Sequence, residues 1–331
     1  MKSILGHGLL ALCIGCAGAA WAGPPDKDDD AGKIKHRLNS DSDSPDSPEL
    51  NPGNTVGSAP TAGGTGTLSA ITNHGGPVMS GAPDIHLIWY GNWAQSNGSD
   101  NAAGQQIVRD FMGSVSGSNW MKINTNTTVT TKGYTDSGGG AVSGNVATVH
   151  SSNFGYLSGK TKLSDANIAT VVSNYVSTQG GATTNAIYFV LTSTDVTASS
   201  GFCSQYCGWH TKGTIGGVAN VKYSFVGNAN RCLSGCAAQT TSPNGNAGVD
   251  GMVSVVAHEL VESLSDPLLN AWYDSSGAEN ADKCAWTFGS GQKQAANGAF
   301  YNVTLGARNF LIQRNLAANS KCYIDGVTGK Q

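Results

Sequence analysis

Residues 250–266 read DGMVSVVAHELVESLSD, and this stretch decides the fold. Apolar residues recur every four positions along it, at Met252, Val256 and Leu260. This spacing predicts an α-helix. Apolar side chains cover most of its circumference, so we expect the helix to lie in the core. Asp250 is the expected N-cap, and Pro267 ends the helix because the residue before a proline avoids helical geometry.

The predicted core helix also carries three ionisable residues, His258, Glu259 and Glu262. Buried charges must be paired or bound to a metal. His258 and Glu262 are four residues apart and share one helix face. The pattern is that of the H-E-x-x-H zinc helix, in which the outer pair binds metal and the first glutamate is the general base. Here a glutamate replaces the second histidine. We therefore predict His258 and Glu262 as ligands and Glu259 as the catalytic base.

Further metal ligands are expected from the end of the helix and from the turn-rich segment 270–284. Asp266 lies at the helix end, and Asp274, Glu279 and Asp282 lie in the segment. Zinc is the expected cofactor because imidazole and carboxylate both ligate it. Calcium is the alternative, since this set of residues is rich in oxygen.

A structural interpretation of these residues competes with the metal site. In it, His258 is a hydrogen-bonded core histidine, and the glutamates pair with Arg308 or Lys283. His210 is a similar case, since it follows a pair of cysteines in C-x3-C-G-W-H. It could line the same cleft as the metal, but a structural role is the favoured interpretation.

The N-terminus is typical of a secretory signal peptide. Lys2 precedes an apolar, uncharged run, and Ala20-Trp21-Ala22 offers small residues at the positions that a signal peptidase reads. We expect residues 1–22 to be removed, cleavage falling after Ala22, and the protein to be secreted, either outside the cell or into a periplasm. The apolar run is too short for a stable membrane insertion.

Six of the eight cysteines follow this leader. An even number in an exported chain predicts disulfides, and export makes a zinc–thiolate cluster the less favoured alternative. Our expected pairing is local within each C-x3-C, with a third bond between the two remaining cysteines. The six residues are Cys203, Cys207, Cys232, Cys236, Cys284 and Cys322.

Composition divides the remaining chain in two. Residues 23–70 are an acidic Ser/Pro/Gly-rich linker that is expected to be disordered, because it has too few apolar residues to form a core. Residues 71–331 form the globular domain. The formal net charge of the whole chain is only −3, and the globular part has no basic stripe. This argues against nucleic acid as a partner.

The globular part alternates between strand and helix patterns. Together they predict a single α+β domain with a central, mostly buried sheet covered by helices, a zincin-like metal-type helix and disulfide-stabilised loops. The expected strands are 84–90, several short ones within 127–149, 186–192 and 218–226, and the expected helices are 102–115 and one beginning at Ser164.

Several stretches of the chain, in order, resemble the EXORDIUM or phosphate-induced protein 1 family of plant extracellular proteins, which has bacterial relatives. They are Gly75–Val78, Ile88–Asn92, Val190–Val196, Phe202–His210, Val226–Asn228, Ser242–Gly245, Gly248–Met252, Ala257–Leu260 and Asn270–Tyr273. The resemblance implies an extracellular or cell-wall location and a link to growth and nutrient responses. It implies no particular reaction.

Two functional hypotheses follow from the sequence. The first is a metal-dependent hydrolase of peptidase type that acts on an extracellular substrate through Glu259. The second is a non-catalytic extracellular protein that binds carbohydrate or a cell-wall polymer, or that signals. In the second, the helix carboxylates are structural or hold a metal that takes no part in a reaction.

Overall fold

A computed structural model describes residues 63–64, 66–125 and 141–331, together with the backbone of a short strand at 34–37. The predicted signal peptide, most of the predicted linker and the first part of the predicted strand region 127–149 lie outside the described residues. Within the described part of that region, residues 141–148 form no strand, and the next strand begins at Val149.

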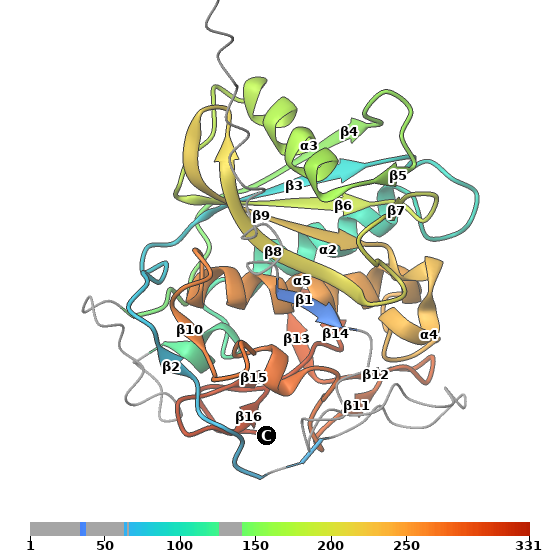
Figure 1. The fold of residues 1–331 in the computed structure, drawn as a ribbon. Coiled ribbons are helices and arrows are strands. Elements are labelled where there is room, and N and C mark those ends of the chain that lie inside the picture. Colours follow the sequence, from blue (N-terminus) through green and yellow to red (C-terminus); the bar gives the residue numbers. More distant parts are fainter. Residues whose placement is uncertain (1–33, 38–62, 65, 126–140) are drawn as a thin grey trace, which may run out of the picture.

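The centre of the domain is a six-stranded sheet in the order β1-β8-β9-β6-β3-β4 (Figure 1). Strands β3, β4, β6 and β9 are parallel, whereas β8 runs antiparallel to β9 and β1 antiparallel to β8. This confirms the mixed α+β class with a central sheet. The strand bounds are β1 Ile34–Arg37, β3 Asp84–Tyr90, β4 Val149–Gly155, β6 Ala186–Thr192, β8 Tyr206–Ile215 and β9 Val218–Gly227.

Helices cover both faces of this sheet (Figure 1). The connection from β3 to β4 contains α2, Ala102–Val115, and the connection from β4 to β6 contains α3, Asp165–Ser177. Helix α3 packs on one face, and α5, Ala247–Ser265, packs on the other face with α2 against it. Among the helices of the described residues, none is long and apolar enough to cross a membrane.

Local sequence sets where these helices begin. Asn101 caps α2 by accepting from the N–H of Gly104. Ser164 caps α3 in a capping box with Asn167, which satisfies two backbone donors that the helix itself leaves unpaired. The predicted cap of the core helix was wrong. Asn246, not Asp250, accepts from the helix backbone, so α5 begins one turn earlier than expected.

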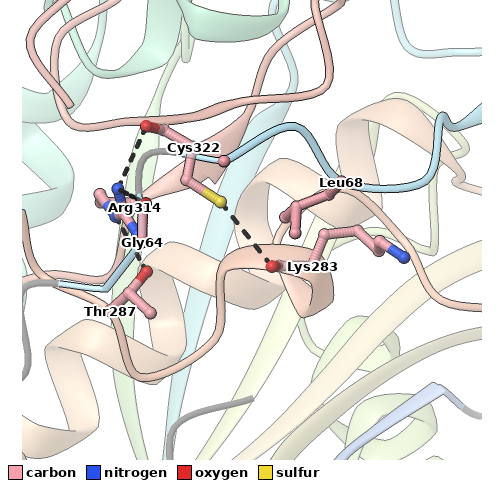
Figure 2. A pocket seen from close by; sticks show the side chains of 7 residues that line it. Gly64, Leu68, Lys283, Thr287, Arg314 and Cys322 are labelled. Carbon is pink, nitrogen blue, oxygen red and sulfur yellow. Dashed lines mark hydrogen bonds between the residues drawn. The ribbon is translucent and has the colours of Figure 1, made fainter. Parts of the chain in front are cut away.

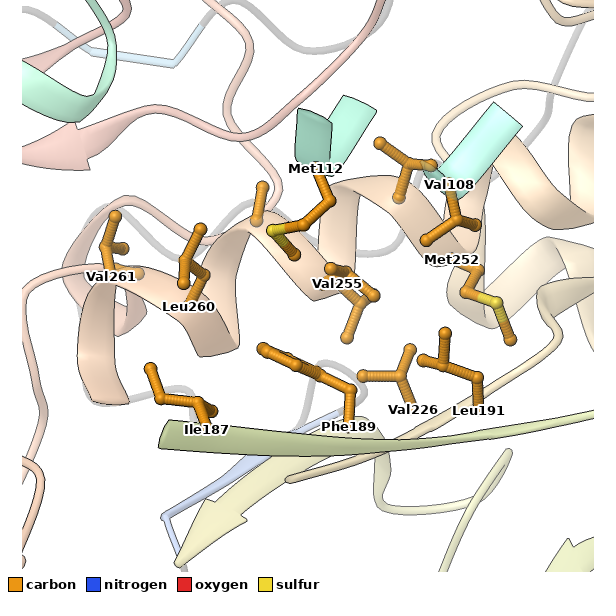
Figure 3. Packing of buried hydrophobic residues seen from close by; sticks show 14 of the residues in the cluster. Val108, Met112, Ile187, Phe189, Leu191, Val226, Met252, Val255, Leu260 and Val261 are labelled. Atoms are coloured by element: carbon orange, nitrogen blue, oxygen red, sulfur yellow. The ribbon is translucent and has the colours of Figure 1, made fainter. Parts of the chain in front are cut away.

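Helix α5 lies between β6 and α2, as Figure 3 shows. Along β6, Ile187, Phe189 and Leu191 point toward the helix because alternate residues of a strand share one face. The helix packs against them with Val255 and Leu260, which are both buried. Eighteen of the helix residues are buried, which confirms the prediction of a core helix. Its polar residues are therefore held away from water.

The segment after α5 is built from short strands and turns that pack beneath the helix (Figure 1). One small strand pair joins it to more distant residues, because β10 pairs with β2; the small pair of β5 and β7 lies outside this segment. The remaining bounds are β2 Thr72–Asn73, β5 Lys162–Leu163, β7 Thr197–Ala198, β10 Trp272–Tyr273, β11 Lys293–Gln294, β12 Phe300–Tyr301, β13 Val303–Leu305, β14 Arg308–Phe310, β15 Asn315–Leu316, β16 Cys322–Tyr323, the helix α4 Leu233–Cys236, and the 3-10 helices η1 Met121–Asn124, η2 Ala229–Arg231 and η3 Asp282–Cys284.

The six cysteines of the described residues all form disulfides, but only one predicted pairing is right. Cys284 bonds to Cys322, as expected. The local pairs were wrong: Cys203 bonds to Cys232, and Cys207 bonds to Cys236. Cys203 lies in the turn before β8 and Cys207 lies in β8 itself, whereas Cys232 and Cys236 lie at the two ends of α4. The two bonds instead link the start of β8 to α4.

Candidate metal centre

Three ionisable side chains of α5 lie in the interior. His258 is 1% exposed, and Glu259 and Glu262 are fully buried. The Nε2 atom of His258 lies 3.0 Å from Oε1 of Glu262, one turn along the helix, and 3.3 Å from Oδ1 of Asp282. The backbone N–H of Asp282 donates to the same Oε1 of Glu262 over 3.0 Å. The segment after the helix therefore folds back over the predicted pair.

His210 reaches the same place from the sheet. It lies on β8 and is 1% exposed. Its Nε2 atom lies 2.8 Å from Oε2 of Glu279 and 3.8 Å from Oε2 of Glu262. The two carboxylate oxygens of Glu262 thus face two different histidines, one on the helix and one on the sheet.

Glu259 lies one step round the helix, against β8. One carboxylate oxygen of Glu259 lies within 4.8 Å of a ring nitrogen of His210 and of a carboxylate oxygen of Glu262. Among the described residues, no hydrogen-bond donor reaches either of its carboxylate oxygens. A Cβ atom built on Gly208 would stand 3.1 Å from Oε1 of Glu259 and 2.6 Å from Val255, so the glycine makes room for this side chain.

Asp266 and Glu279 lie at one edge of a cluster of ionisable side chains whose other members are His210, His258, Glu259, Glu262 and Asp282. Asp266 is the C-cap of α5, and its Oδ1 accepts from the N–H groups of Asn270 and Ala271. Burial raises the pKa of Asp266 to about 6, although the N–H groups of Ala271 and Asn270 and a hydrogen bond with Glu279 oppose the rise. The carboxyl groups of Asp266 and Glu279 therefore adjoin each other.

The cations proposed as structural partners bind elsewhere. Nε of Arg308 lies 2.6 Å from Oδ2 of Asp110, and Nζ of Lys283 lies 2.5 Å from Oδ2 of Asp274. Within the described residues, the ion pairs of the cluster involve only its two histidines. The alternative pairing of the glutamates with Arg308 or Lys283 is therefore not found among the described residues. Asp274 is also occupied outside the cluster.

Burial dominates the electrostatics of the cluster. It raises the pKa of Glu262 to about 7, with the charge of Asp282 adding to the effect, and raises those of Glu259 and Glu279 well above the ordinary value. Burial lowers the pKa of His210 to about 3. Burial also opposes protonation of His258, but the charge of Glu262 and hydrogen bonds with Asp282 and Glu262 raise its pKa well above normal. The carboxyl groups of the cluster are therefore difficult to ionise unless a cation lies beside them.

These side chains fit a divalent metal. Two imidazoles and several carboxylates are within reach of one another, and the groups His210–Glu259–Glu262 and His258–Glu262–Asp282 could each hold an ion. Buried carboxylate oxygens without donors, on Glu259, Glu262 and Glu279, are the atoms that a cation would satisfy. Imidazole nitrogen favours zinc over calcium, which takes oxygen ligands almost exclusively.

The structure brings together most of the residues that the sequence singled out. His258, Glu259, Glu262, Glu279 and Asp282 all lie in the cluster, with Asp266 at its edge. His210, for which a structural role was favoured over a place in the cleft, also lies in the cluster, where its Nε2 atom contacts Glu279. Its position could not be predicted because β8 was not predicted. The aromatic residues Tyr206 and Trp209 flanking Gly208 were the available signal for a strand.

A small pocket lies near the cluster but is not part of it. Figure 2 shows its lining, which includes Lys283, Thr287, Arg314 and Cys322. The guanidinium of Arg314 donates to Thr287 and to the carbonyl oxygens of Gly64 and Cys322. None of the cluster residues lines this pocket. It joins the N-terminal end of the domain to its C-terminal segment.

Comparison with known proteins places the chain in a family. The model of the phosphate-induced protein 1 conserved region matches residues 71–322. The chain belongs to the phosphate-induced protein 1 family. The match contains every residue of the cluster and all six disulfide-bonded cysteines, so the centre lies inside the phosphate-induced protein 1 region.

Several plant proteins of this family are similar to the chain. Protein EXORDIUM-like 3 of Arabidopsis thaliana is 32% identical over 289 residues, covering 76% of this chain and 81% of the relative. Protein PHOSPHATE-INDUCED 1 of Nicotiana tabacum is 29% identical over 246 residues, covering 66% and 72%. No solved structure matches the chain. The expected zincin-like character of α5 therefore has no support from these comparisons.

Proposed function

We propose that this protein is a secreted metal-dependent hydrolase of peptidase type. The observation that carries the proposal is the cluster around α5, in which buried carboxylates and two histidines face one another and, among the described residues, form no ion pair with lysine or arginine. Such a group is stable when a cation neutralises it. Zinc is the proposed metal.

His258, Glu262 and Asp282 supply the first ligand set. Their ligand atoms lie within 4.8 Å of one another, and Asp282 is held by the segment that the Cys284–Cys322 disulfide anchors. A bound zinc ion supplies Lewis acidity, which polarises a substrate carbonyl. The protein side chains carry out the other steps of the reaction, including the proton transfers.

Glu259 is the proposed general base. Its oxygens have no donor among the described residues, and it adjoins both His210 and Glu262. It takes a proton from the attacking water and then returns that proton to the leaving group. Burial raises its pKa well above normal, and a neighbouring dication opposes that rise. The combination brings the base toward the working pH.

Secretion is supported by independent features. The chain begins with a sequence typical of an export signal, and three disulfides are formed by its other cysteines. Disulfides persist in oxidising compartments outside the cytosol. We therefore propose that the protein works extracellularly, or in a periplasm, on a substrate of that compartment.

One observation favours the second hypothesis, a binding protein with a structural metal. Every cluster side chain is buried except Asp282, which is 18% exposed. Structural zinc sites are closed, whereas catalytic ones keep a position open to substrate. If the protein is a hydrolase, the segment that carries Asp282 must therefore move when substrate binds.

The variant Glu259→Gln separates these functions. It keeps the size of the side chain but removes the basic oxygen, so zinc should stay bound while hydrolysis falls about 100-fold or more. Activity would be measured on a fluorogenic peptide library and on aryl esters, and zinc by elemental analysis. Asp250→Asn is the matched control, because it makes the same charge change on the same helix outside the cluster. If wild type and variant are equally inactive and both bind zinc, the hydrolase is contradicted and the hypothesis of a binding protein with a structural metal remains.

A further inference from the structure

We infer that the cluster holds two divalent cations bridged by Glu262. The inference rests on the proposed function, which requires only one ion. Its starting point is that the two oxygens of one buried carboxylate face different histidines. Oε1 lies 3.0 Å from Nε2 of His258, and Oε2 lies 3.8 Å from Nε2 of His210.

Each half of this arrangement has its own carboxylate partner. On the Oε1 side, Nε2 of His258 lies 3.3 Å from Oδ1 of Asp282. On the Oε2 side, Nε2 of His210 lies 2.8 Å from Oε2 of Glu279. Each ion would thus have one imidazole, one carboxylate of its own and one oxygen of the bridging Glu262. The two sets come from different parts of the fold, the helix and the sheet, and meet at Glu262.

The charge of the cluster also exceeds what one ion neutralises. When all five acids of the cluster are ionised, a single dication leaves three negative charges uncompensated, whereas two dications leave one. An uncompensated buried charge is strongly destabilising. The five acids are Glu259, Glu262, Asp266, Glu279 and Asp282.

Glu259 gives independent support for a second cation, beside His210 and Glu262. It is fully buried, and among the described residues neither of its oxygens meets a donor. It groups with His210 and Glu262, not with His258 and Asp282. The atoms nearest to it are therefore those of the second ligand set. A base in this position lies beside the second ion, where it can act on water.

Two ions that share Glu262 as a ligand would extend the proposed chemistry. Pairs of metal ions in hydrolases stabilise both the attacking and the leaving oxygen of a displacement. The residues of this chain would hold the two ions through Glu262 and place Glu259 next to them. Zinc, which accepts both imidazole and carboxylate, suits both positions.

Zinc stoichiometry tests the inference. Mature protein loaded with zinc alone and then freed of excess should hold two equivalents by elemental analysis. His210→Ala and His258→Ala should each retain one equivalent, and Glu262→Ala should lose both or bind zinc at least 100-fold more weakly. Asp250→Asn is the control and should keep two. Near-ultraviolet circular dichroism of each variant checks that it is folded.

The outcomes separate this inference from the proposed function. One equivalent in the wild type overturns the two-ion centre even if every variant misfolds, and it leaves the hydrolase standing if Glu259→Gln abolishes activity. Two equivalents without hydrolysis support the two-ion centre and contradict the hydrolase. No bound zinc contradicts both. Cobalt(II) adds a second measurement: a bridged pair should show magnetic coupling in its paramagnetic resonance spectrum, and two uncoupled signals would overturn the bridge.

Discussion

Glu262 is the residue on which the whole cluster depends. Its Oε1 accepts the backbone N–H of Asp282 and faces His258, while its Oε2 faces His210. A glutamine could keep the first hydrogen bond but could not carry the charge that two cations require. The length of the glutamate matters too, because its carboxylate stands between a helix and a strand and contacts both.

At this scale the sequence predicted that His258 and Glu262 share one face of α5, but not which residues from other elements would join them. The spacing of His258 and Glu262 on a helix face is a local property, so the pair could be recognised directly. Glu279 and Asp282 were found only as members of a set of nearby acids, because the fold of an irregular segment does not follow from its composition. His210 lies 48 residues before His258 in the chain, and only the packing of β8 on α5 brings the two together.

Another buried histidine, His86 on β3, gives a prediction about pH. Burial lowers its pKa to about 4, with the charge of His150 adding to the effect and that of Asp84 opposing it. Its ring stacks on those of His150 and Tyr188, and its Nδ1 lies 2.9 Å from the hydroxyl of Tyr175.

Because this pKa is depressed on folding, the neutral ring contributes stability above pH 6.5, and that stability is lost as the pH falls toward 4. Urea unfolding should show that His86→Phe loses about 1 kcal/mol less than wild type between pH 7 and pH 5, after allowance for solvent near the ring. His150→Phe serves as the control for the neighbouring ring. Identical losses in wild type and His86→Phe would show that this histidine is not responsible.

At the scale of elements, the site requires β8, a strand that the sequence did not predict. It carries His210 toward the cluster, and two disulfides link its start to α4. The C-x3-C spacing suggested a loop, because two cysteines so close in sequence are expected to pair locally. Cys203 lies in the turn before the strand and Cys207 lies within it, and each pairs with a cysteine 29 residues further along.

Gly208 shows how closely β8 and α5 approach. We predict that Gly208→Ala costs about 1–3 kcal/mol in the free energy of unfolding, because the added methyl group would meet Val255 at 2.6 Å and a backbone oxygen of Phe225 at 3.0 Å. The methyl group would also push against Glu259, so we expect weaker zinc binding.

Gly213→Ala in the same strand is the matched control. Its methyl group would meet only the ring of Tyr223, at 3.2 Å. Urea unfolding and zinc titration of both variants provide the measurement. Equal effects of the two substitutions would mean that the approach of Glu259 to β8 contributes nothing particular to the centre.

At the scale of the whole molecule, the alternation of strand and helix patterns was enough to predict one sheet covered by helices. Strand β3, helix α2 and strand β6 have the predicted bounds, because each is a long apolar pattern with polar residues at its ends. The small strand pairs after α5 were not predicted. Each has only two or three residues per strand, too few for any periodicity to appear.

The N-terminal end of the domain gives the last prediction. Its residues are fixed to the C-terminal segment: the N–H of Leu68 donates to the carbonyl oxygen of Ser320 over 2.8 Å, and β2 pairs with β10. Ile71 between them is buried. A chain beginning at residue 63 keeps these contacts, and all cluster residues lie far beyond that point. It should bind as much zinc as the mature chain and melt within a few degrees of it.

A chain beginning at residue 76 loses all of these contacts. Burial of Ile71 contributes about 2 kcal/mol and the lost hydrogen bonds about 1 kcal/mol each, so its melting temperature should fall by roughly 10 °C. Calorimetry of the two truncated chains with zinc bound measures the difference. The opposite result, a large fall already for the chain beginning at 63, would mean that residues 23–62 stabilise the fold. The contact responsible would then be β1, which pairs with β8 at the position of His210.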